Sequence, residues 1–367
     1  MTVGIVTPYF PDSNTRNSGI ANHYYLLAEA LKNAGHSVII IHVRPKYGEE
    51  HNDYEKNCLP NGNILLTYKV GIPSLLMKLL RNKWSIIDFL LKLNCMLLVY
   101  KNMSSIIKKY NIEVIETTSY FSLCYLYLLR DIQIPFILRV STTFLQMMDT
   151  YYPFNSRLLS LIGLLEINFI KRNKNIITHA HNHAIELENL YQIDRTRFRI
   201  IPHGINLPNK VAQRTNVTHP LKILYVGRLE YRKGTDILLK AIPLVLNIYN
   251  DIHFEIIGTD RDNKYQTEFR NKNSGTINER VTFFGEVDNE VINASYAGCD
   301  IFVAPSRYES FGLIYIEAMS YSKPVIACKV GGVPEIVING WNGLFSDPED
   351  PINLAQKIIY LVEHPEK

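Results

Sequence analysis

The stretch KILYVGRLEYRKGTDILLKAIPLVLNIY, residues 222–249, begins with a short apolar run and continues into a pattern with helical spacing. The run at 222–226 predicts a strand, and apolar residues at helical spacing predict a helix over 234–249. The next apolar run, 254–258, completes a strand–helix–strand unit. Continuous apolar strands of this kind are typical of a parallel sheet that helices cover on both faces.

The same alternation of strand and helix patterns extends on both sides of this stretch. Toward the carboxyl end, the pattern predicts strands at 281–284, 301–304 and 324–327 and a helix at 311–321. Toward the amino end, it predicts strands at 3–7, 38–43, 114–116, 136–140 and 175–178, a strand that ends in a turn within 199–206, and helices at 20–31 and 156–171. The segment 207–219, LPNKVAQRTNVTH, has no apolar periodicity and is predicted to be a linker. The sequence therefore predicts an α/β protein with two doubly wound Rossmann-like domains, 1–206 and 220–367, facing each other across a cleft.

The chain has 367 residues, which suits two domains of about 150–200 residues each. Its five cysteines form no CxxC pair and no Cys/His cluster, which argues against a disulfide framework and a structural zinc site. The first residues, MTVGIVTPYF, have the pattern of a strand and lack the regions of a signal peptide. The longest apolar stretches are broken by Asp88, Lys92 and Glu166. We therefore expect a cytoplasmic protein.

Basic residues are concentrated in the first predicted domain. Residues 1–205 carry 22 Lys and Arg against 15 Asp and Glu, whereas residues 206–367 carry 17 against 20. Within 69–109, eight basic residues are interleaved with Leu, Ile and Trp84, and Asp88 is the acidic residue. This mixture favours peripheral binding at the inner face of a membrane over binding of nucleic acid. A solvated basic helix face is the alternative interpretation.

Two cations follow the predicted strand at 222–226. Arg228 and Lys233 project from the carboxyl end of that strand, just ahead of a predicted helix. Ligands of parallel sheets bind beyond the carboxyl ends of the strands, and a helix N-terminus attracts anions. The pattern therefore predicts a site for a phosphate or diphosphate. An ion pair of either cation with Glu230 or Asp236 is the structural alternative.

The segment DIFVAPSRYESFGLIYIEAM, residues 300–319, predicts a strand, a turn and a helix. The first helix amides, which are expected to face the same site, lie around Ser310, Phe311, Gly312 and Leu313. Glu309 lies in the turn, where its carboxylate is suited to accept hydrogen bonds from sugar hydroxyls beside the phosphate. Glu317, about two turns into the helix, is suited to bind both hydroxyls of a ribose. A nucleoside-diphosphate sugar contains all three parts.

Several short motifs occur in an order that resembles one known family. They are PHGIN at 202–206, GRLxxxKG at 227–234, the Glu309–Glu317 pair with FG between, KPVIACKVGGVPEIV at 323–337 and NGLF at 342–345. This series is similar to that of the GT-B glycosyltransferases of family 4, a retaining group that uses nucleotide sugars. The motifs span about 199–345, and the resemblance extends more weakly to residue 1.

The resemblance implies a role for each candidate residue. Arg228 and Lys233 hold the diphosphate, Glu317 the ribose and Glu309 the donor sugar, while the first domain takes the acceptor. The family usually has a Gly-Gly pair in its first loop, and only Gly19 carries over. Ser141 stands where the family often has a histidine. In the family a further helix commonly follows the segment that corresponds to LAQKIIYLVEHPEK, and we expect that this helix is either missing or cut off by truncation at Lys367.

The expected activity is transfer of a sugar, with retention, from a nucleoside-diphosphate sugar to an acceptor hydroxyl, in cell-surface polysaccharide or glycolipid synthesis of the bacterial type. The expected acceptor is lipid-linked, and no nucleic acid is expected as a partner. Other interpretations are a nucleotide-sugar epimerase, a non-catalytic nucleotide-sugar-binding subunit, and a membrane-surface adaptor.

We expect no metal and no cofactor besides the donor substrate. Asp260-Arg261-Asp262 spells DxD but is predicted to be a solvated loop. His179, His181 and His183 alternate without an acidic or Cys partner nearby, which argues against a zinc site. No GxGxxG follows the first strand, so a dinucleotide cofactor is not expected.

Overall fold

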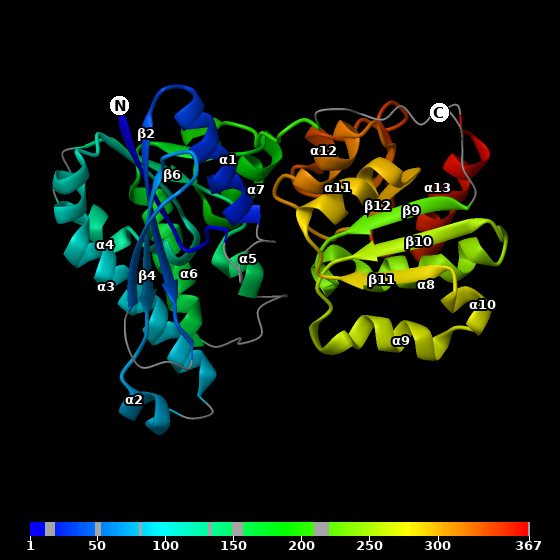
Figure 1. Ribbon diagram of the computed structural model, residues 1–367, viewed down its shortest axis with the longest axis horizontal. Helices are drawn as coiled ribbons and strands as arrows, with labels where there is room; N and C mark the ends of the chain where they lie inside the picture. Colours follow the sequence, from blue (N-terminus) through cyan, green and yellow to red (C-terminus); the bar gives the residue numbers. More distant parts are fainter. Residues whose placement is uncertain are drawn as a thin grey trace. The chain divides into compact units, whose positions relative to one another are not determined.

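The computed structural model describes residues 1–11, 19–47, 53–80, 83–130, 134–148, 157–208 and 220–365. Contacts divide the chain into two compact units, Met1–Gly204 and Ile205–Lys367. Each unit is built on its own sheet (Figure 1). Most of the predicted linker, 209–219, lies outside the described residues, and Leu207 and Pro208 are in no helix or strand.

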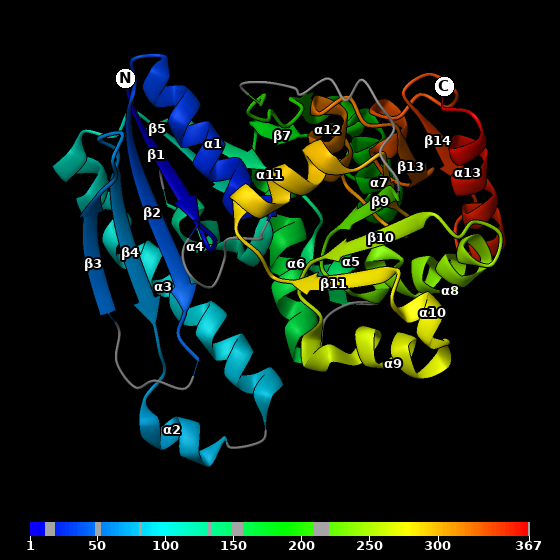
Figure 2. The same ribbon diagram turned by 45° about the vertical axis from the view of Figure 1, so that its right-hand side comes forward.

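The first unit contains an eight-stranded sheet among the described residues, in the order β3-β4-β2-β1-β5-β6-β7-β8. All neighbours run parallel except β3, which pairs antiparallel with β4 at one edge (Figure 2). The strands are β1 (Thr2–Thr7), β2 (Ser37–Pro45), β3 (Asp53–Cys58), β4 (Ile64–Val70), β5 (Val114–Thr118), β6 (Phe136–Arg139), β7 (Ile176–Thr178) and β8 (Phe198–Ile200). The helices are α1 (Gly19–Asn33), α2 (Ser74–Leu79), α3 (Trp84–Tyr110), α4 (Tyr125–Leu128), α5 (Phe144–Met148), α6 (Arg157–Arg172) and α7 (His181–Tyr191).

The central strands of this sheet are buried on both faces, as their continuous apolar runs predict. Val38 and Ile40 of β2 pack in the core cluster that contains Tyr24 of α1. Ile39 and Ile41 point to the opposite face and join the larger cluster that contains residues of α3 and α6. Successive side chains of a strand alternate between faces, so one apolar strand supplies both cores.

The second unit contains a six-stranded, all-parallel sheet in the order β11-β10-β9-β12-β13-β14. Its strands are β9 (Leu221–Val226), β10 (Ile252–Ile257), β11 (Val281–Gly285), β12 (Ile301–Ala304), β13 (Val325–Cys328) and β14 (Gly343–Ser346). Its helices are α8 (Thr235–Leu246), α9 (Lys264–Lys272), α10 (Gly275–Asn278), α11 (Asn289–Gly298), α12 (Leu313–Ser320) and α13 (Pro351–Glu363). The order reverses between β9 and β12, which is where doubly wound sheets bind their ligands.

The strand predicted within 199–206 is present but short, Phe198–Ile200, and the PHGIN segment that follows has no regular structure. Three strands were missed. Strands β3 and β4 were not predicted, and β3 is an exposed, polar edge strand without apolar alternation. Strand β14 was also missed, because its four residues include a glycine and a serine.

The long helix α3 contains a buried ion pair. Asp88 and Lys92 are both 0% exposed and contact each other one helical turn apart. The hydroxyl of Tyr47 donates a hydrogen bond of 2.5 Å to Asp88 Oδ1, and Lys92 Nζ lies 4.5 Å from the ring centroid of Phe121. Burial lowers the pKa of Lys92, and the charge of Asp88 opposes this shift.

Within the described residues, no helix is both long enough and apolar enough to span a bilayer.

We predict that Asp88→Asn lowers the free energy of unfolding by about 3–5 kcal/mol, because it leaves the Lys92 cation buried without its counter-charge. The double variant Asp88→Leu/Lys92→Met removes both charges and should recover most of that loss. Urea denaturation of the two variants and the wild type measures the difference. Equal stability of Asp88→Asn and the wild type would contradict the prediction.

Candidate functional site

The loop that follows β9 enters α8 through a one-turn 3₁₀ helix, η3 (Tyr231–Lys233). Gly234 caps α8 with a φ of +66°, and a Cβ at this position would lie 1.8 Å from the carbonyl oxygen of Pro305. A side chain is therefore excluded both by the left-handed backbone and by the neighbouring chain. The loop after β9 therefore packs in direct contact with the loop after β12.

Backbone hydrogen bonds hold the loop after β12 from both sides. The Arg307 N–H donates a hydrogen bond of 2.8 Å to the carbonyl of Arg232, and the Gly332 N–H donates one of 3.0 Å to the carbonyl of Glu309. Arg307 also donates two side-chain hydrogen bonds, of 2.6 and 3.0 Å, to the carboxylate of Asp236 in the first turn of α8. The backbone that carries Glu309 is thereby fixed relative to the backbone that carries Lys233.

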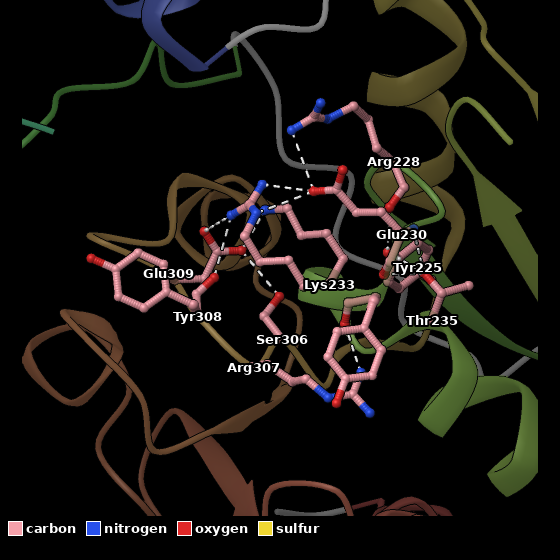
Figure 3. A network of polar contacts seen from close by, with 11 residues as sticks. Tyr225, Arg228, Glu230, Lys233, Thr235, Ser306, Arg307, Tyr308 and Glu309 are labelled. Carbon is pink, nitrogen blue, oxygen red and sulfur yellow. Dashed lines mark hydrogen bonds and ion pairs between the residues drawn. The ribbon is translucent and has the colours of Figure 1, made fainter. Parts of the chain in front are cut away.

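Glu309 and Lys233 form the centre of the site (Figure 3). Lys233 Nζ lies 2.5 Å from Glu309 Oε1, and the hydroxyl of Ser306 donates a hydrogen bond of 3.0 Å to the same oxygen. Arg232 Nη1 lies 3.9 Å from Glu309 Oε2. Glu309 is 8% exposed, so this carboxylate is buried among cations and a hydroxyl group.

The neighbouring charges favour the ionised form of Glu309. Burial alone would raise the pKa of Glu309, but the charges of Lys233 and Arg232 outweigh burial and lower it. Burial lowers the pKa of Lys233, and Glu309 opposes that shift. A buried charge is tolerated when a partner and hydrogen bonds compensate its desolvation.

Arg228 lies apart from this buried pair. Its side chain is 51% exposed, and its Nη2 lies 3.3 Å from Glu230 Oε1. Glu230 also pairs with Arg232, at 2.9 Å. The ion pair with Glu230, our structural alternative for Arg228, is therefore present. Three cations (Arg228, Arg232 and Lys233) stand against two carboxylates (Glu230 and Glu309), which leaves this loop cluster with one net positive charge.

Glu317 has a different environment. It is the fifth residue of α12, just over one turn from the start, so the predicted depth of two turns was wrong. The hydroxyl of Tyr296 donates a hydrogen bond of 3.0 Å to Glu317 Oε2. Burial raises the pKa of Glu317, with the Tyr296 hydrogen bond and the charge of Lys233 opposing the shift. The hydroxyl of Tyr296, rather than a Lys or Arg, therefore compensates the partial burial of the Glu317 carboxylate.

The predicted amide-bearing segment lies next to Glu309. Gly312 caps α12 with a φ of +104°, a conformation that glycine adopts readily, and Leu313 is the first helical residue. Phe311 is buried and Ser310 half-buried. The N–H groups of the first helical turn point out of the amino end of α12, where they favour anions.

The structure brings Lys233 and Glu309 into contact, together with two residues that the sequence analysis missed, whereas Arg228 contacts Glu230 and Glu317 contacts Tyr296. Arg232 and Ser306 both contact Glu309, and both lie inside the quoted motifs GRLEYRKG and APSRYES. Gly19 begins α1 in the first unit and is not part of this cluster. Ser141 follows β6 in the first unit, and no hydrogen-bond partner of its buried Oγ is found among the described residues.

A cavity of about 180 Å³ lies at the carboxyl ends of β9, β10 and β11. It is smaller than the roughly 300–1,000 Å³ of pockets that enclose a drug-sized ligand, so it suits part of a larger molecule. Its lining residues include Leu229, Gly258, Thr259, Phe283 and Glu286. Leu229 is the neighbour of Arg228, so the cavity adjoins the cationic loop.

The DxD segment has a structural role. Asp260 accepts hydrogen bonds from the N–H groups of Tyr265 and Gln266, at 3.2 and 2.8 Å, at the start of α9. The side chain of Asp262 is 90% exposed. In the described part of the chain, no group of three or more His, Cys, Asp or Glu residues is arranged to hold a metal ion.

Two family models match the chain. Glycosyltransferase Family 4 matches residues 17–208, which is more than half of the sequence, and Glycosyl transferases group 1 matches residues 220–364. Glycogen synthase of Mycobacterium tuberculosis is 28% identical over 205 residues, which cover 56% of this chain and 49% of that protein. An uncharacterized glycosyltransferase of Methanocaldococcus jannaschii is 36% identical over 143 residues, or 39% of this chain and 38% of that protein. The chain thus spans about half or less of these relatives' lengths.

Solved structures show the same fold. Sucrose-phosphate synthase from Thermosynechococcus elongatus superposes with a TM-score of 0.70 at 22% identity, covering 100% of this chain and 90% of that one. Anabaena HepE, solved in complex with UDP and glucose, gives a TM-score of 0.63 at 15% identity, covering 99% and 90%. The two parallel-sheet units confirm the predicted GT-B fold class. The chain belongs to glycosyltransferase family 4.

Proposed function

We propose that this protein transfers a sugar, with retention at the anomeric carbon, from a nucleoside-diphosphate sugar to an acceptor hydroxyl. The observation that carries the proposal is the Lys233–Glu309 pair, held with Arg232 between two helix N-termini at the point where the sheet order reverses. Membership of a glycosyltransferase family supports it, as does the UDP found in the structure of HepE.

Each part of the donor has a counterpart in the second unit. The cavity beside Leu229 would take the base, and Glu317 would bind the ribose. The diphosphate would lie against Arg228, Lys233 and the first amides of α12, where the loop carries net positive charge. Glu309 would bind the hydroxyls of the donor sugar.

The chemistry requires charge stabilisation more than a nucleophile. The bond between the anomeric carbon and the diphosphate oxygen breaks, and the acceptor oxygen bonds that carbon from the same face. The acceptor proton passes to the departing phosphate oxygen. Lys233, Arg228 and the α12 amides stabilise the negative charge that develops there, and each such donor contributes about 3–4 kcal/mol. With these cations in place, the proposal requires no metal ion.

Two other activities share parts of this site. A nucleotide-sugar epimerase would use the same donor but release an altered nucleotide sugar, and a binding subunit would hold the donor without turnover. The test is a panel of nucleotide sugars, screened for thermal stabilisation of the protein and then for donor consumption with and without excess EDTA. Stabilisation with donor cleavage that survives EDTA supports the proposal. An isomerised donor indicates the epimerase, and stabilisation without cleavage the binding subunit.

We further propose that the acceptor is lipid-linked and is presented at a membrane surface, in polysaccharide or glycolipid synthesis. Leu75 and Leu79 on α2 are 78% and 76% exposed, and Trp84 is 46% exposed. The neighbouring Lys78 and Lys83 are exposed as well. Apolar and aromatic side chains beside cations are the combination that binds an anionic membrane interface.

We predict that Arg228→Ala reduces turnover by about two orders of magnitude, as the loss of one transition-state donor does. Lys233→Ala should have at least as large an effect. Since it also leaves Glu309 buried without its nearest cation, its fold must be checked by circular dichroism. Arg261→Ala is the matched control, because Arg261 is an exposed arginine in the loop after β10. Near-normal turnover of both site variants would contradict the diphosphate assignment.

We predict that substitutions of the two glutamates change different kinetic constants. Glu317→Gln weakens a hydrogen bond that the ribose makes in ground and transition states alike. The donor should therefore lose about 1–2 kcal/mol of binding free energy, which raises its KM. Glu309→Gln acts where positive charge develops, so kcat should fall more than KM rises. Steady-state kinetics and nucleoside-diphosphate affinity distinguish the two. Changes in melting temperature alone, in both variants, would contradict these roles.

Sedimentation with vesicles tests the membrane proposal. Binding to anionic vesicles should exceed binding to neutral ones and weaken as salt is added. The double variant Lys78→Glu/Lys83→Glu should lose most of this preference, whereas Lys272→Glu, an exposed lysine of the second unit, should keep it. Equal binding to both vesicle types would contradict the proposal.

A further inference from the structure

The helices α11 and α12 lie side by side in the second unit (Figure 1), and a hydrogen bond between side chains joins them. Tyr296 of α11 donates this bond, of 3.0 Å, to Oε2 of Glu317, which lies 21 residues further along the chain. Tyr296 is 1% exposed, so its hydroxyl reaches the carboxylate from the core. The bond therefore connects the core of the second unit to a residue of the candidate site.

Aromatic contacts hold the ring of Tyr296 on two sides. The ring of Phe302, a fully buried residue of β12, has its centroid 5.6 Å from that of Tyr296. The ring of Tyr321 stacks on Tyr296, with centroids 5.8 Å apart and an angle of 14° between the planes. A side chain enclosed in a close-packed core keeps one rotamer. The hydroxyl of Tyr296 is therefore a hydrogen-bond donor in a fixed position.

This fixed donor restrains the side chain of Glu317. Glu317 is half-buried, and no other hydrogen bond or ion pair of its carboxylate is found among the described residues. Its second oxygen, Oε1, is not among the buried polar atoms that lack a partner, so solvent reaches it. Tyr296 thus holds one carboxylate oxygen from the core side and leaves the other open to a ligand.

A carboxylate held in this way can accept more than one further hydrogen bond. An ionised carboxylate has about four lone-pair sites, and Tyr296 occupies one of them. The 2′- and 3′-hydroxyls of a ribose are neighbours on the same face of the sugar ring. The two oxygens of one carboxylate can accept both hydroxyls, provided that the carboxylate plane is turned toward them. A carboxylate that rotates freely loses this alignment in most of its orientations.

The same hydrogen bond favours the form of Glu317 that accepts. Burial raises the pKa of Glu317, whereas the hydrogen bond from Tyr296 and the charge of Lys233 oppose this shift. Lys233 is the cation to which the proposed function assigns the diphosphate. Glu317 and Lys233 thus interact electrostatically, as the sites for the ribose and the diphosphate of one nucleotide should.

We propose that Tyr296 is a positioning residue that orients the Glu317 carboxylate to accept both ribose hydroxyls, so that the site selects a ribonucleoside-diphosphate donor over a 2′-deoxyribonucleoside-diphosphate one. Tyr296 acts through Glu317 and does not contact the donor. A 2′-deoxyribose leaves one acceptor position of the oriented carboxylate unpaired, and an unpaired, partly buried acceptor weakens binding. The inference rests on the proposed function, because that function assigns Glu317 to the ribose.

The test compares matched nucleotides in the wild type and in Tyr296→Phe, which removes the hydroxyl and keeps the ring. Calorimetry measures the dissociation constants of UDP and dUDP, GDP and dGDP, and ADP and dADP, and the pair with the tightest ribonucleotide is used. The deoxynucleotide should bind about tenfold more weakly than the ribonucleotide in the wild type, the effect of one hydrogen bond to a charged group. In Tyr296→Phe this ratio should fall to about threefold or less.

Tyr321→Phe is the matched control. It removes a hydroxyl from the ring that stacks on Tyr296, and no hydrogen bond of that hydroxyl is found among the described residues. The control should therefore keep the wild-type ratio. In steady-state kinetics, Tyr296→Phe should raise KM for the ribonucleotide donor and leave kcat nearly unchanged, because the ribose hydrogen bonds are made in ground and transition states alike.

A wild-type ratio in Tyr296→Phe, accompanied by a lower melting temperature, overturns the inference, because a purely structural hydrogen bond gives that result. Equal binding of ribonucleotide and deoxynucleotide by the wild type also overturns it, and this measurement does not depend on how any variant folds. Both outcomes leave the proposed donor class intact, since a ribonucleoside diphosphate still binds. Absence of binding by all three ribonucleoside diphosphates would instead contradict the proposed function, and this inference with it.

Discussion

The contact between Lys233 and Glu309 is the interaction on which the second unit's site depends. The two residues lie on loops that follow β9 and β12, which are neighbours in the sheet. Neither charge could be buried there alone, because desolvation of an isolated ion costs several kcal/mol. The pair therefore links two loops whose backbones must also fit closely. The fit is possible because Gly234 has no side chain that would clash with the carbonyl oxygen of Pro305.

This arrangement has a chemical consequence. A cation that already has an anionic partner is held in one position, so it would not have to reorganise to bind the proposed diphosphate. The hydroxyl of Ser306 and the guanidinium of Arg232 hold the carboxylate in turn. Arg228, half exposed and paired to Glu230 at 3.3 Å, is more weakly restrained. The site thus combines a rigid buried pair with a solvent-accessible cation.

The two units use the same sheet edge for different electrostatics. In the second unit, Arg228, Arg232 and Lys233 contact the carboxylates of Glu230 and Glu309, and Arg307 pairs with Asp236 in the first turn of α8. In the first unit, the ion pair of Glu116 with Arg139 lies among imidazoles whose pKa values are lowered by burial. Both are variations on a parallel sheet, in which the carboxyl ends of several strands deliver side chains to one edge.

The sequence by itself determined the fold class and most residues of the candidate site in the second unit. Apolar runs and helical spacing are local properties, so β9, α8, β12 and α12 were predicted close to their observed bounds. The motifs around Arg228, Lys233, Glu309 and Glu317 placed those residues on the correct loops and helix. Polar or short edge strands such as β3 and β14 carry no periodic signal, and they were missed.

Only the tertiary structure decided which of these residues touch. The partner of Glu317 is Tyr296, 21 residues away, and the pairing of His23 with His203 joins positions 180 residues apart. Such pairs depend on how strands are ordered and how loops pack, and neither leaves a mark on local composition. The alternating histidines at 179–183 suggested a metal site to be weighed, whereas the fold places His179 against His203 and His183 against Thr178. Sequence spacing fixes which element carries a side chain, but the order of the strands fixes what that side chain meets.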